Sequence, residues 1–374
     1  MTRRPRLLAV IVAASVVAAG SALPSPGVSA APRQLPTLIP GDEWDMATPE
    51  EAGLDPDVLG GVALEAAGSN SHCLVVVRYG RLAAEWYWND TTPTDAHQVF
   101  SVTKSLTSAL VGVARRDGAL AITQSAADFI PEWAGTEAEA VTIEDLLSMD
   151  SGREWTFELD YQEMVGAPDR SAFAVGLDQT AAPDTEWMYN NAASQTLSEV
   201  LQAATGVEPA DYAEEELFDV IGMEHTDMGV DASGNTTAFF DVTSTCRDLA
   251  RFGLLYLNDG DWDGAEVIPA DYVAASVGQP SQELNAAYGY LWWLNRPGPV
   301  VDNILAPVVA GSSDNTKDGP MIPGAPEDMF WASGLFGQRI QVDPGSETVV
   351  VRLGADDLEN EILARVVTEA VVDD

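Results

Sequence analysis

The chain has 374 residues, of which 46% are hydrophobic and 8% aromatic, a composition typical of a folded globular protein. Its 59 acidic and 18 basic residues give a formal net charge of −41. Negative charge of this size repels nucleic-acid phosphates and anionic lipid headgroups, which argues against nucleic-acid binding. We interpret the acidic excess as a solvated surface, because the alternative, a cation-binding face, has no loop with the DxDxDG spacing of calcium loops.

The first thirty residues have the pattern of a secretory signal peptide. Three arginines among the first six residues precede an apolar stretch, and small residues lead to a cleavage point after Ala30. The apolar stretch is too short for a membrane anchor. We therefore expect residues 1–30 to be a signal peptide and residues 31–43 a proline-containing linker. The protein is then secreted or extracytoplasmic, with no membrane span in its mature form.

A β-hairpin is predicted next in the chain. Residues 73–78 and 82–88 are apolar and rich in β-prone side chains, and the turn between them contains Gly80. Cys73 opens the first of these runs, and Cys246, the only other cysteine, begins a predicted helix. In an oxidising compartment the two can form a disulfide, whereas two buried free thiols fit the sequence equally well. The sequence leaves both possibilities open.

The segment after this hairpin contains a candidate nucleophile. Leu106, Leu110 and Val113 follow helical spacing, so Ser101 stands at or just before the first turn and Lys104 lies one turn further on. A helix N-terminus and a nearby cation both favour negative charge on the serine oxygen. If burial lowers the pKa of the lysine, the neutral amine can accept the serine proton.

The middle of the chain, residues 119–239, is predicted to be mostly helical. Thr142 and Asp145 have the spacing of a capping box. Further along, Tyr189 and Asn191 lie on a loop before a helix that ends near Gly206. The phenol can relay a proton to a leaving group and the amide can hold a substrate carbonyl, although a tyrosine that only packs in the core is an alternative.

The last third of the chain returns to strands. A strand over 288–294 precedes a polar loop, and a second hairpin precedes an amphipathic helix. The predicted segments are the loop 297–326, the hairpin strands 338–342 and 348–353, and the helix 358–371.

These elements predict an α/β (α+β) sandwich. Strands at both ends of the chain would form one mostly antiparallel sheet, flanked by helices and carrying a helical insertion. We expect a single domain over residues 44–374, with its α/β part at about 44–118 and 240–374 and its helical part at about 119–239.

A third motif lies before the second hairpin, at Ser333, Gly334 and Leu335. A glycine in a strand lets a ligand approach the backbone closely. The backbone amide of Leu335 can then pair with that of Ser101 to bind an oxyanion.

The order and spacing of these three motifs resemble the serine β-lactamase and penicillin-recognising enzyme superfamily. The similarity runs from about Trp44 to the end of the chain and is greatest to the class C-like branch, which includes family VIII carboxylesterases, D-alanyl-D-alanine carboxypeptidases and 6-aminohexanoate-dimer hydrolases. The run from Gly334 to Arg339 looks most like the last group. The resemblance implies a β-lactamase/transpeptidase-like fold.

The resemblance also implies roles for individual residues. Ser101 would be the nucleophile, Lys104 its base, Tyr189 a proton relay and Asn191 a substrate-positioning residue, while Leu335 would give the second oxyanion amide. The chain departs from the family at Ala332, which stands where lactamases and carboxypeptidases carry a lysine or a histidine. Recognition of a substrate carboxylate is therefore not expected.

We accordingly expect a serine hydrolase that forms an acyl-enzyme on a small neutral ester, amide or peptide, with no metal or organic cofactor. Alternatives are a D-alanyl-D-alanine carboxypeptidase, a β-lactamase, or a catalytically silent binding protein of the same fold. The sequence does not favour an α/β-hydrolase triad or a zinc protease site, since the chain has no Gly-x-Ser-x-Gly or His-Glu-x-x-His motif.

Overall fold

The computed structural model describes residues 37–372. The predicted signal peptide and the first part of the predicted linker lie outside the described residues. Residues 37–43 run beside the first hairpin, where the Leu38 amide donates to the carbonyl of Tyr79. Gly80 is required at that turn, because a Cβ atom there would lie 1.7 Å from the Leu38 carbonyl oxygen.

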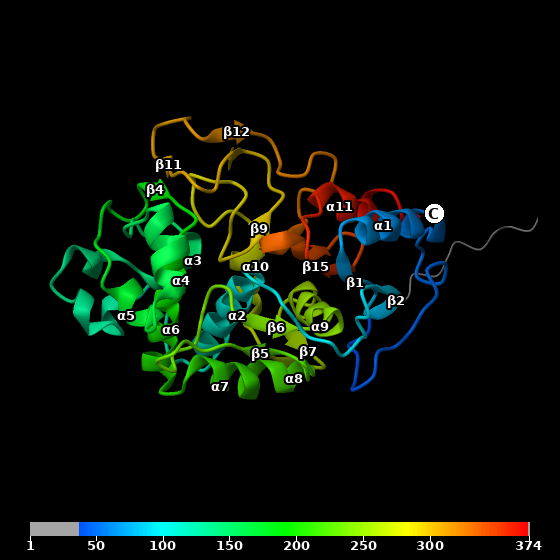
Figure 1. Cartoon of the computed structure of the whole chain (residues 1–374), viewed down its shortest axis with the longest axis horizontal. Helices are drawn as coiled ribbons and strands as arrows, with labels where there is room; N and C mark the ends of the chain where they lie inside the picture. The colour runs from blue at the N-terminus through cyan, green and yellow to red at the C-terminus, as the bar shows by residue number, and fades with distance from the viewer. Residues whose placement is uncertain (1–36, 373–374) are drawn as a thin grey trace, which may run out of the picture. The chain divides into compact units, whose positions relative to one another are not determined.

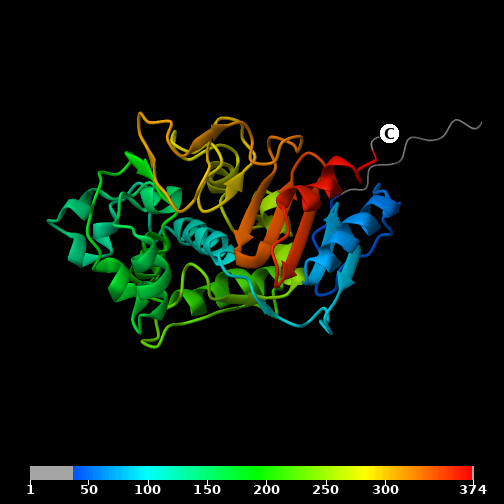
Figure 2. The same ribbon diagram turned by 45° about the horizontal axis from the view of Figure 1, so that its top comes forward.

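The main sheet has six strands in the order β2-β1-β15-β14-β13-β9, and all of its pairings are antiparallel. Strands from the two ends of the chain meet in it, because β1 pairs with β15, from Ser71 opposite Gly354 to Arg78 opposite Thr348. Figure 2 shows the blue N-terminal strands beside the orange and red C-terminal ones. The six strands are β1 (Ser71–Arg78), β2 (Arg81–Tyr87), β9 (Trp293–Leu294), β13 (Phe330–Gly334), β14 (Gln338–Asp343) and β15 (Thr348–Gly354).

Different helices cover the two faces of this sheet, because alternate residues of a strand point to opposite sides. Along β1, Val75 and Val77 belong to the main core, whereas Leu74 and Val76 belong to a second cluster. α2 and α9 pack on the main-core side, and α1 and α11 lie side by side on the other (Figure 1). These helices are α1 (Pro56–Gly68), α2 (Val102–Arg116), α9 (Cys246–Leu257) and α11 (Asn360–Thr368). The predicted sheet, built from both ends of the chain and flanked by helices, is confirmed.

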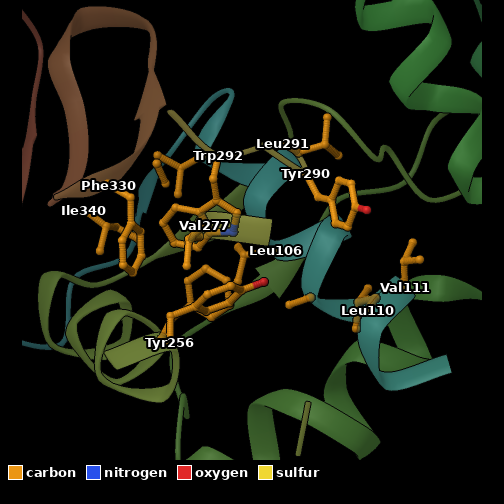
Figure 3. Packing of buried hydrophobic residues seen from close by; sticks show 14 of the residues in the cluster. Leu106, Leu110, Val111, Tyr256, Val277, Tyr290, Leu291, Trp292, Phe330 and Ile340 are labelled. Atoms are coloured by element: carbon orange, nitrogen blue, oxygen red, sulfur yellow. The ribbon is translucent and has the colours of Figure 1, made fainter. Parts of the chain in front are cut away.

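The helix α2 is buried along almost its whole length. Figure 3 shows Leu106 beside the rings of Trp292 and Tyr256, and Leu110, one turn further along α2, belongs to the same core. Gly112 lets α10 (Ala270–Val277) approach closely, because a Cβ atom there would stand 2.8 Å from the ring of Tyr272. The strongly buried apolar contacts hold the N-terminal end of α2 in one position relative to the sheet.

The structure joins Cys73 on β1 to Cys246 at the start of α9 in a disulfide, with a Cα–Cα distance of 6.3 Å. Thr245 caps this helix by accepting from the amide of Asp248. The bridge therefore links the sheet to the helix that covers it, across a sequence separation of 173 residues.

The regular structure between α2 and α9 is mainly helical, and its α-helices gather beside α2 (Figure 1). The capping box of Thr142 and Asp145 is present, and Gly206 ends its helix in the left-handed conformation. The α-helices of this region are α3 (Ile143–Ser148), α4 (Met164–Gly166), α5 (Arg170–Val175), α6 (Asn191–Thr205), α7 (Pro209–Ala213) and α8 (Asp219–Ile221), and α10 (Ala270–Val277) follows α9.

Two sequence predictions about the last third of the chain are wrong. The strand expected over 288–294 is reduced to Trp293–Leu294, because the chain turns back at Leu291, whose φ is 59°, and Tyr288 bridges to Trp293. The loop 297–326 contains short strands.

The short strands pair locally or with the helical part. They are β3 (His97–Gln98), β5 (Asp227–Met228) and β6 (Val242–Ser244) in one sheet, with the pairs β4 (Glu186–Trp187) and β11 (Val308–Val309), β10 (Pro299–Val301) and β12 (Thr316–Asp318), and β7 (Asp261–Trp262) and β8 (Ala265–Glu266). Across residues 37–372, no helix is both long and apolar enough to cross a membrane.

Candidate active site

Ser101 is the N-cap of α2, as the sequence predicts, and its side chain makes no capping hydrogen bond. The residue before it, Phe100, has a φ of 51°. Such a backbone conformation is strained for a bulky residue and persists only where the surroundings impose it. The tight turn leaves the hydroxyl of Ser101 half-buried at the start of a helix whose N-terminus favours negative charge.

Lys104 lies one turn along α2 and is 1% exposed. Its Nζ donates to Ser101 Oγ at 3.1 Å, to Asn191 Oδ1 at 2.7 Å and to the carbonyl of Phe239 at 3.1 Å. Burial lowers the pKa of Lys104 to about 7, against the opposing influence of the negative charge on Asp160. A lysine with such a pKa is neutral in a large fraction of molecules near pH 7, so it can accept the serine proton.

Tyr189 lies against the same lysine. Nζ of Lys104 stands 4.8 Å from the centre of its ring, and the ring stacks on Trp293 with centroids 6.0 Å apart. Burial raises the pKa of Tyr189 above its usual value, and a hydrogen bond with Ser101 opposes that shift. The phenol is therefore protonated and next to the candidate nucleophile, as a proton relay requires.

Asn191, the first residue of α6, connects Lys104 to a buried carboxylate. Its Oδ1 accepts from Lys104 and its Nδ2 donates to Asp160 Oδ2 at 2.8 Å. The amide orientation follows, because the carboxylate of Asp160 can only accept, which places the amide nitrogen on its side and the amide oxygen on the side of Lys104. Both polar atoms of the side chain are thus engaged inside the protein, and its contact with a substrate stays a prediction.

Asp160 belongs to the site but was not predicted from the sequence. This residue is 1% exposed and accepts from the amides of Asn191 and Ala192, at 3.2 and 2.8 Å, besides the Asn191 side chain. Burial raises the pKa of Asp160, while the two backbone hydrogen bonds and the charge of Lys104 lower it. Since all of its partners donate, the ionised form fits the site. The only sequence signal was an acidic residue in a predicted helix, which is common on surfaces.

The third predicted motif lies at the end of β13, against the loop that carries Ser101. A Cβ atom on Gly334 would stand 2.2 Å from the carbonyl oxygen of Val99, so only glycine allows this approach. Immediately after it, the ring of Phe336 meets that of Phe100 edge to face, with centroids 5.4 Å apart. Both chain neighbours of Leu335 thus lie against the residues that precede Ser101, and Ser333 is half-buried on the same strand.

Arg339 and two histidines near the site have other partners. Arg339 directs Nη1 to the carbonyls of Gly334 and Gln338 and its Nε to Asn360. His97 stacks on His72 with ring centroids 4.0 Å apart. Ala332 is buried in the main core, and no charged group replaces it at that position of β13.

The structure thus brings Ser101, Lys104, Tyr189, Asn191 and the third motif together, although they come from three distant parts of the sequence. A buried amine hydrogen-bonds a serine at the start of a helix, next to an antiparallel sheet with helices on both faces. This arrangement is typical of one class of hydrolases. The family model described as Beta-lactamase matches residues 59–366. The chain belongs to this family, and it is a β-lactamase-family hydrolase.

Individual proteins give the same result. The chain is 23% identical over 308 residues to a 6-aminohexanoate-dimer hydrolase of Paenarthrobacter ureafaciens. The aligned region covers 75% of this chain and 71% of the relative. Among solved structures, a chain from Bacillus anthracis that is provisionally assigned as a 6-aminohexanoate-dimer hydrolase has a TM-score of 0.66 and 21% identity, over 82% of this chain and 79% of that one. A provisionally assigned β-lactamase from Bacteroides dorei has a TM-score of 0.68 and 15% identity, over 85% and 99%. These two structural likenesses concern the fold.

Proposed function

We propose that the protein is a serine hydrolase that forms an acyl-enzyme on Ser101. The observation that carries the proposal is the contact between the buried Nζ of Lys104 and the Oγ of Ser101, at 3.1 Å, together with the lowering of the lysine pKa by burial. A carboxylate in direct contact would stabilise the charged form of Lys104 most strongly. Here the side chain of Asn191 lies between the lysine and the carboxylate of Asp160.

The steps follow from this geometry. Neutral Lys104 takes the proton of Ser101 while the serine oxygen bonds to the substrate carbonyl carbon. The amides of Ser101 and Leu335 stabilise the oxyanion. When the carbonyl re-forms, the bond to the leaving group breaks, and Tyr189 gives its proton to this group while the proton held by Lys104 replaces it, so that the lysine is neutral again. Water then attacks the acyl-enzyme by the same route, and the acid product and free serine are released.

We propose small neutral esters and amides as the substrates. No cation stands at Ala332 to hold a substrate carboxylate, two of the three guanidinium nitrogens of Arg339 are engaged with protein oxygens, and the net charge of −41 opposes the approach of anions. The similarity to a 6-aminohexanoate-dimer hydrolase adds this dimer to the amides to be tested, although its free carboxylate finds no cation at Ala332.

We further propose that the protein acts outside the cytoplasm. The basic and apolar pattern of residues 1–30 supports export, and the disulfide between Cys73 and Cys246 fits an oxidising compartment.

Labelling with a fluorophosphonate probe tests the nucleophile. Mass spectrometry is expected to find the adduct on the peptide that contains Ser101, and Ser101→Ala should abolish both the adduct and the turnover of p-nitrophenyl acetate. Ser105→Ala is the matched control, because this serine is on the same helix but donates to the carbonyl of Leu291. A protein that is neither labelled nor active would support the silent binding protein instead, and labelling of another serine would refute the assignment.

The substrate class is tested separately by comparing kcat/KM for p-nitrophenyl acetate, 6-aminohexanoate dimer, nitrocefin and a D-alanyl-D-alanine peptide. A charge-assisted hydrogen bond to a carboxylate contributes about 1.5–3 kcal/mol, or roughly a tenfold to hundredfold preference, which this site lacks. We therefore expect the ester to be turned over faster than nitrocefin or the peptide. The reverse order would make the protein a β-lactamase or a carboxypeptidase and would point to Arg339 as the cation.

A further inference from the structure

Three aspartates outside the candidate active site converge on one point. Asp145 is in the first turn of α3, Asp150 follows the end of this helix, and Asp184 lies on the loop before β4. One carboxylate oxygen from each lies within 4.8 Å of the other two. Asp184 is distant in sequence from the other two, so no motif marks the cluster.

The central carboxylate of this cluster is buried and incompletely partnered. Asp150 is 2% exposed, and its Oδ1 accepts no hydrogen bond from the residues that the structure describes. Asp145 is 8% exposed and uses one oxygen to cap its own helix, through the amide of Thr142. A buried ionised oxygen without a donor or a cation costs several kcal/mol, so this carboxyl group must either hold a proton or bind a cation.

The surroundings of the cluster offer further negative charge. Glu144 is a neighbour of both buried aspartates and accepts from the hydroxyl of Tyr290. Burial, followed by the charges of Asp145 and Asp184, raises the pKa of Asp150 to about 8. None of the ion pairs within residues 37–372 includes a member of the cluster.

We propose that Asp145, Asp150 and Asp184 bind one calcium ion. Calcium takes six to eight oxygen ligands at about 2.3–2.6 Å in flexible geometry, so ligands on opposite sides of the ion stand up to about 5 Å apart. The spacing of the three carboxylates satisfies this limit. Asp184 is exposed, so water can complete the coordination from that side. Magnesium fits less well, because it demands near-ideal octahedral geometry with ligands at about 2.0–2.1 Å.

The position of the ion would connect the end of α3 with the loop that leads to Tyr189. Two backbone hydrogen bonds already join these segments, from Asp184 to Asp150 at 3.1 Å and from Met188 to Met149 at 2.9 Å. An ion shared by both segments would remain bound only while they are together, so calcium should stabilise the folded state.

The test is calcium binding by the full chain after removal of divalent ions with EDTA. Isothermal titration calorimetry should show one calcium ion per chain, and calcium in large excess over its dissociation constant should raise the Tm by at least about 3 °C. Asp184→Asn, an exposed change that leaves the core intact, and Asp150→Asn should both lose the heat of binding and most of the rise in Tm. Asp314→Asn, which removes an exposed aspartate outside the cluster, should keep both.

The comparison with magnesium at equal ionic strength separates binding from general screening of the negative charge. A response to calcium that is equal in all four proteins, or is matched by magnesium in all of them, overturns the proposal. So does a wild-type protein that binds no calcium at neutral pH, because Asp150 would then keep its proton and hydrogen-bond to a neighbouring carboxylate. These measurements do not depend on catalytic activity.

Discussion

Replacing Asp160 with asparagine tests how the structure sets the pKa of the candidate base. The amide of Asn191 separates the two charged groups through hydrogen bonds of 2.7 and 2.8 Å. The ammonium nitrogen and the carboxylate oxygen are then about 7 Å apart, and at an effective dielectric constant of about 20 their attraction is about 2 kcal/mol. This attraction favours the ammonium form, so its loss should lower the pKa of Lys104 by about one to two pH units.

The assay is the pH dependence of kcat/KM for p-nitrophenyl acetate, which reports ionisations of the free enzyme. In the wild type we expect kcat/KM to rise with pH as Lys104 loses its proton, with a midpoint near the pKa of about 7. In Asp160→Asn the rise should occur at lower pH, because the neutral amine then persists in more acidic solution. An unchanged midpoint in a folded variant would refute the reasoning, as would a shift to higher pH.

A second buried aspartate controls for loss of stability. Asp231 is 7% exposed and accepts from the backbone amides of Arg170, Ser233 and Asn235. It is not among the groups that influence the pKa of Lys104. Asp231→Asn should therefore lower the Tm, as Asp160→Asn does, because each asparagine leaves backbone donors without a full partner. Only Asp160→Asn should move the pH midpoint.

Three further changes have defined outcomes. Tyr189→Phe should lower kcat/KM by a factor of about a hundred or more through loss of proton transfer, and full activity in steady-state assays would remove the relay from the mechanism. Replacing Cys73 and Cys246 with serine should lower the free energy of unfolding by about 2–5 kcal/mol, because the bridge closes a long loop, and denaturant curves that coincide with those of the wild type would contradict this. Gly334→Ala should reduce kcat/KM by about a hundredfold, since the new methyl group would push the oxyanion amide away from the loop at Val99, and unchanged kinetics would show that this amide is dispensable.

Local patterns in the sequence were sufficient to predict several elements. The i, i+3 spacing of Ser101 and Lys104 places both at the start of one helix, where the structure has them in contact. The continuous apolar run from Cys73 to Val77 is typical of a strand that is buried on both faces, as the structure has it. The failure at 288–294 has a physical cause, because Leu291 adopts a positive φ that its β-prone neighbours do not reveal.

Tertiary contacts account for what the sequence did not show. Asp160 lies in a short π-helical turn, and its importance depends on the amide of Asn191 that folding brings to it. The interpretation of the acidic residues as a solvated surface does not extend to Asp150, whose burial follows from packing between α3 and a distant loop. Such residues have no spacing that marks them, because their partners are far away in the chain.

The pairing of β1 with β15 has a consequence for how the protein reaches its native state. β15 lies between β1 and β14, so the sheet cannot close until residues 348–354 have left the ribosome. Contacts between segments that are so distant in sequence make folding slow. A polypeptide interrupted before Thr348 would leave β1 and β14 each with an unpaired edge, open to aggregation and proteolysis. Premature termination late in translation should therefore yield an insoluble product rather than a shortened, partly active hydrolase.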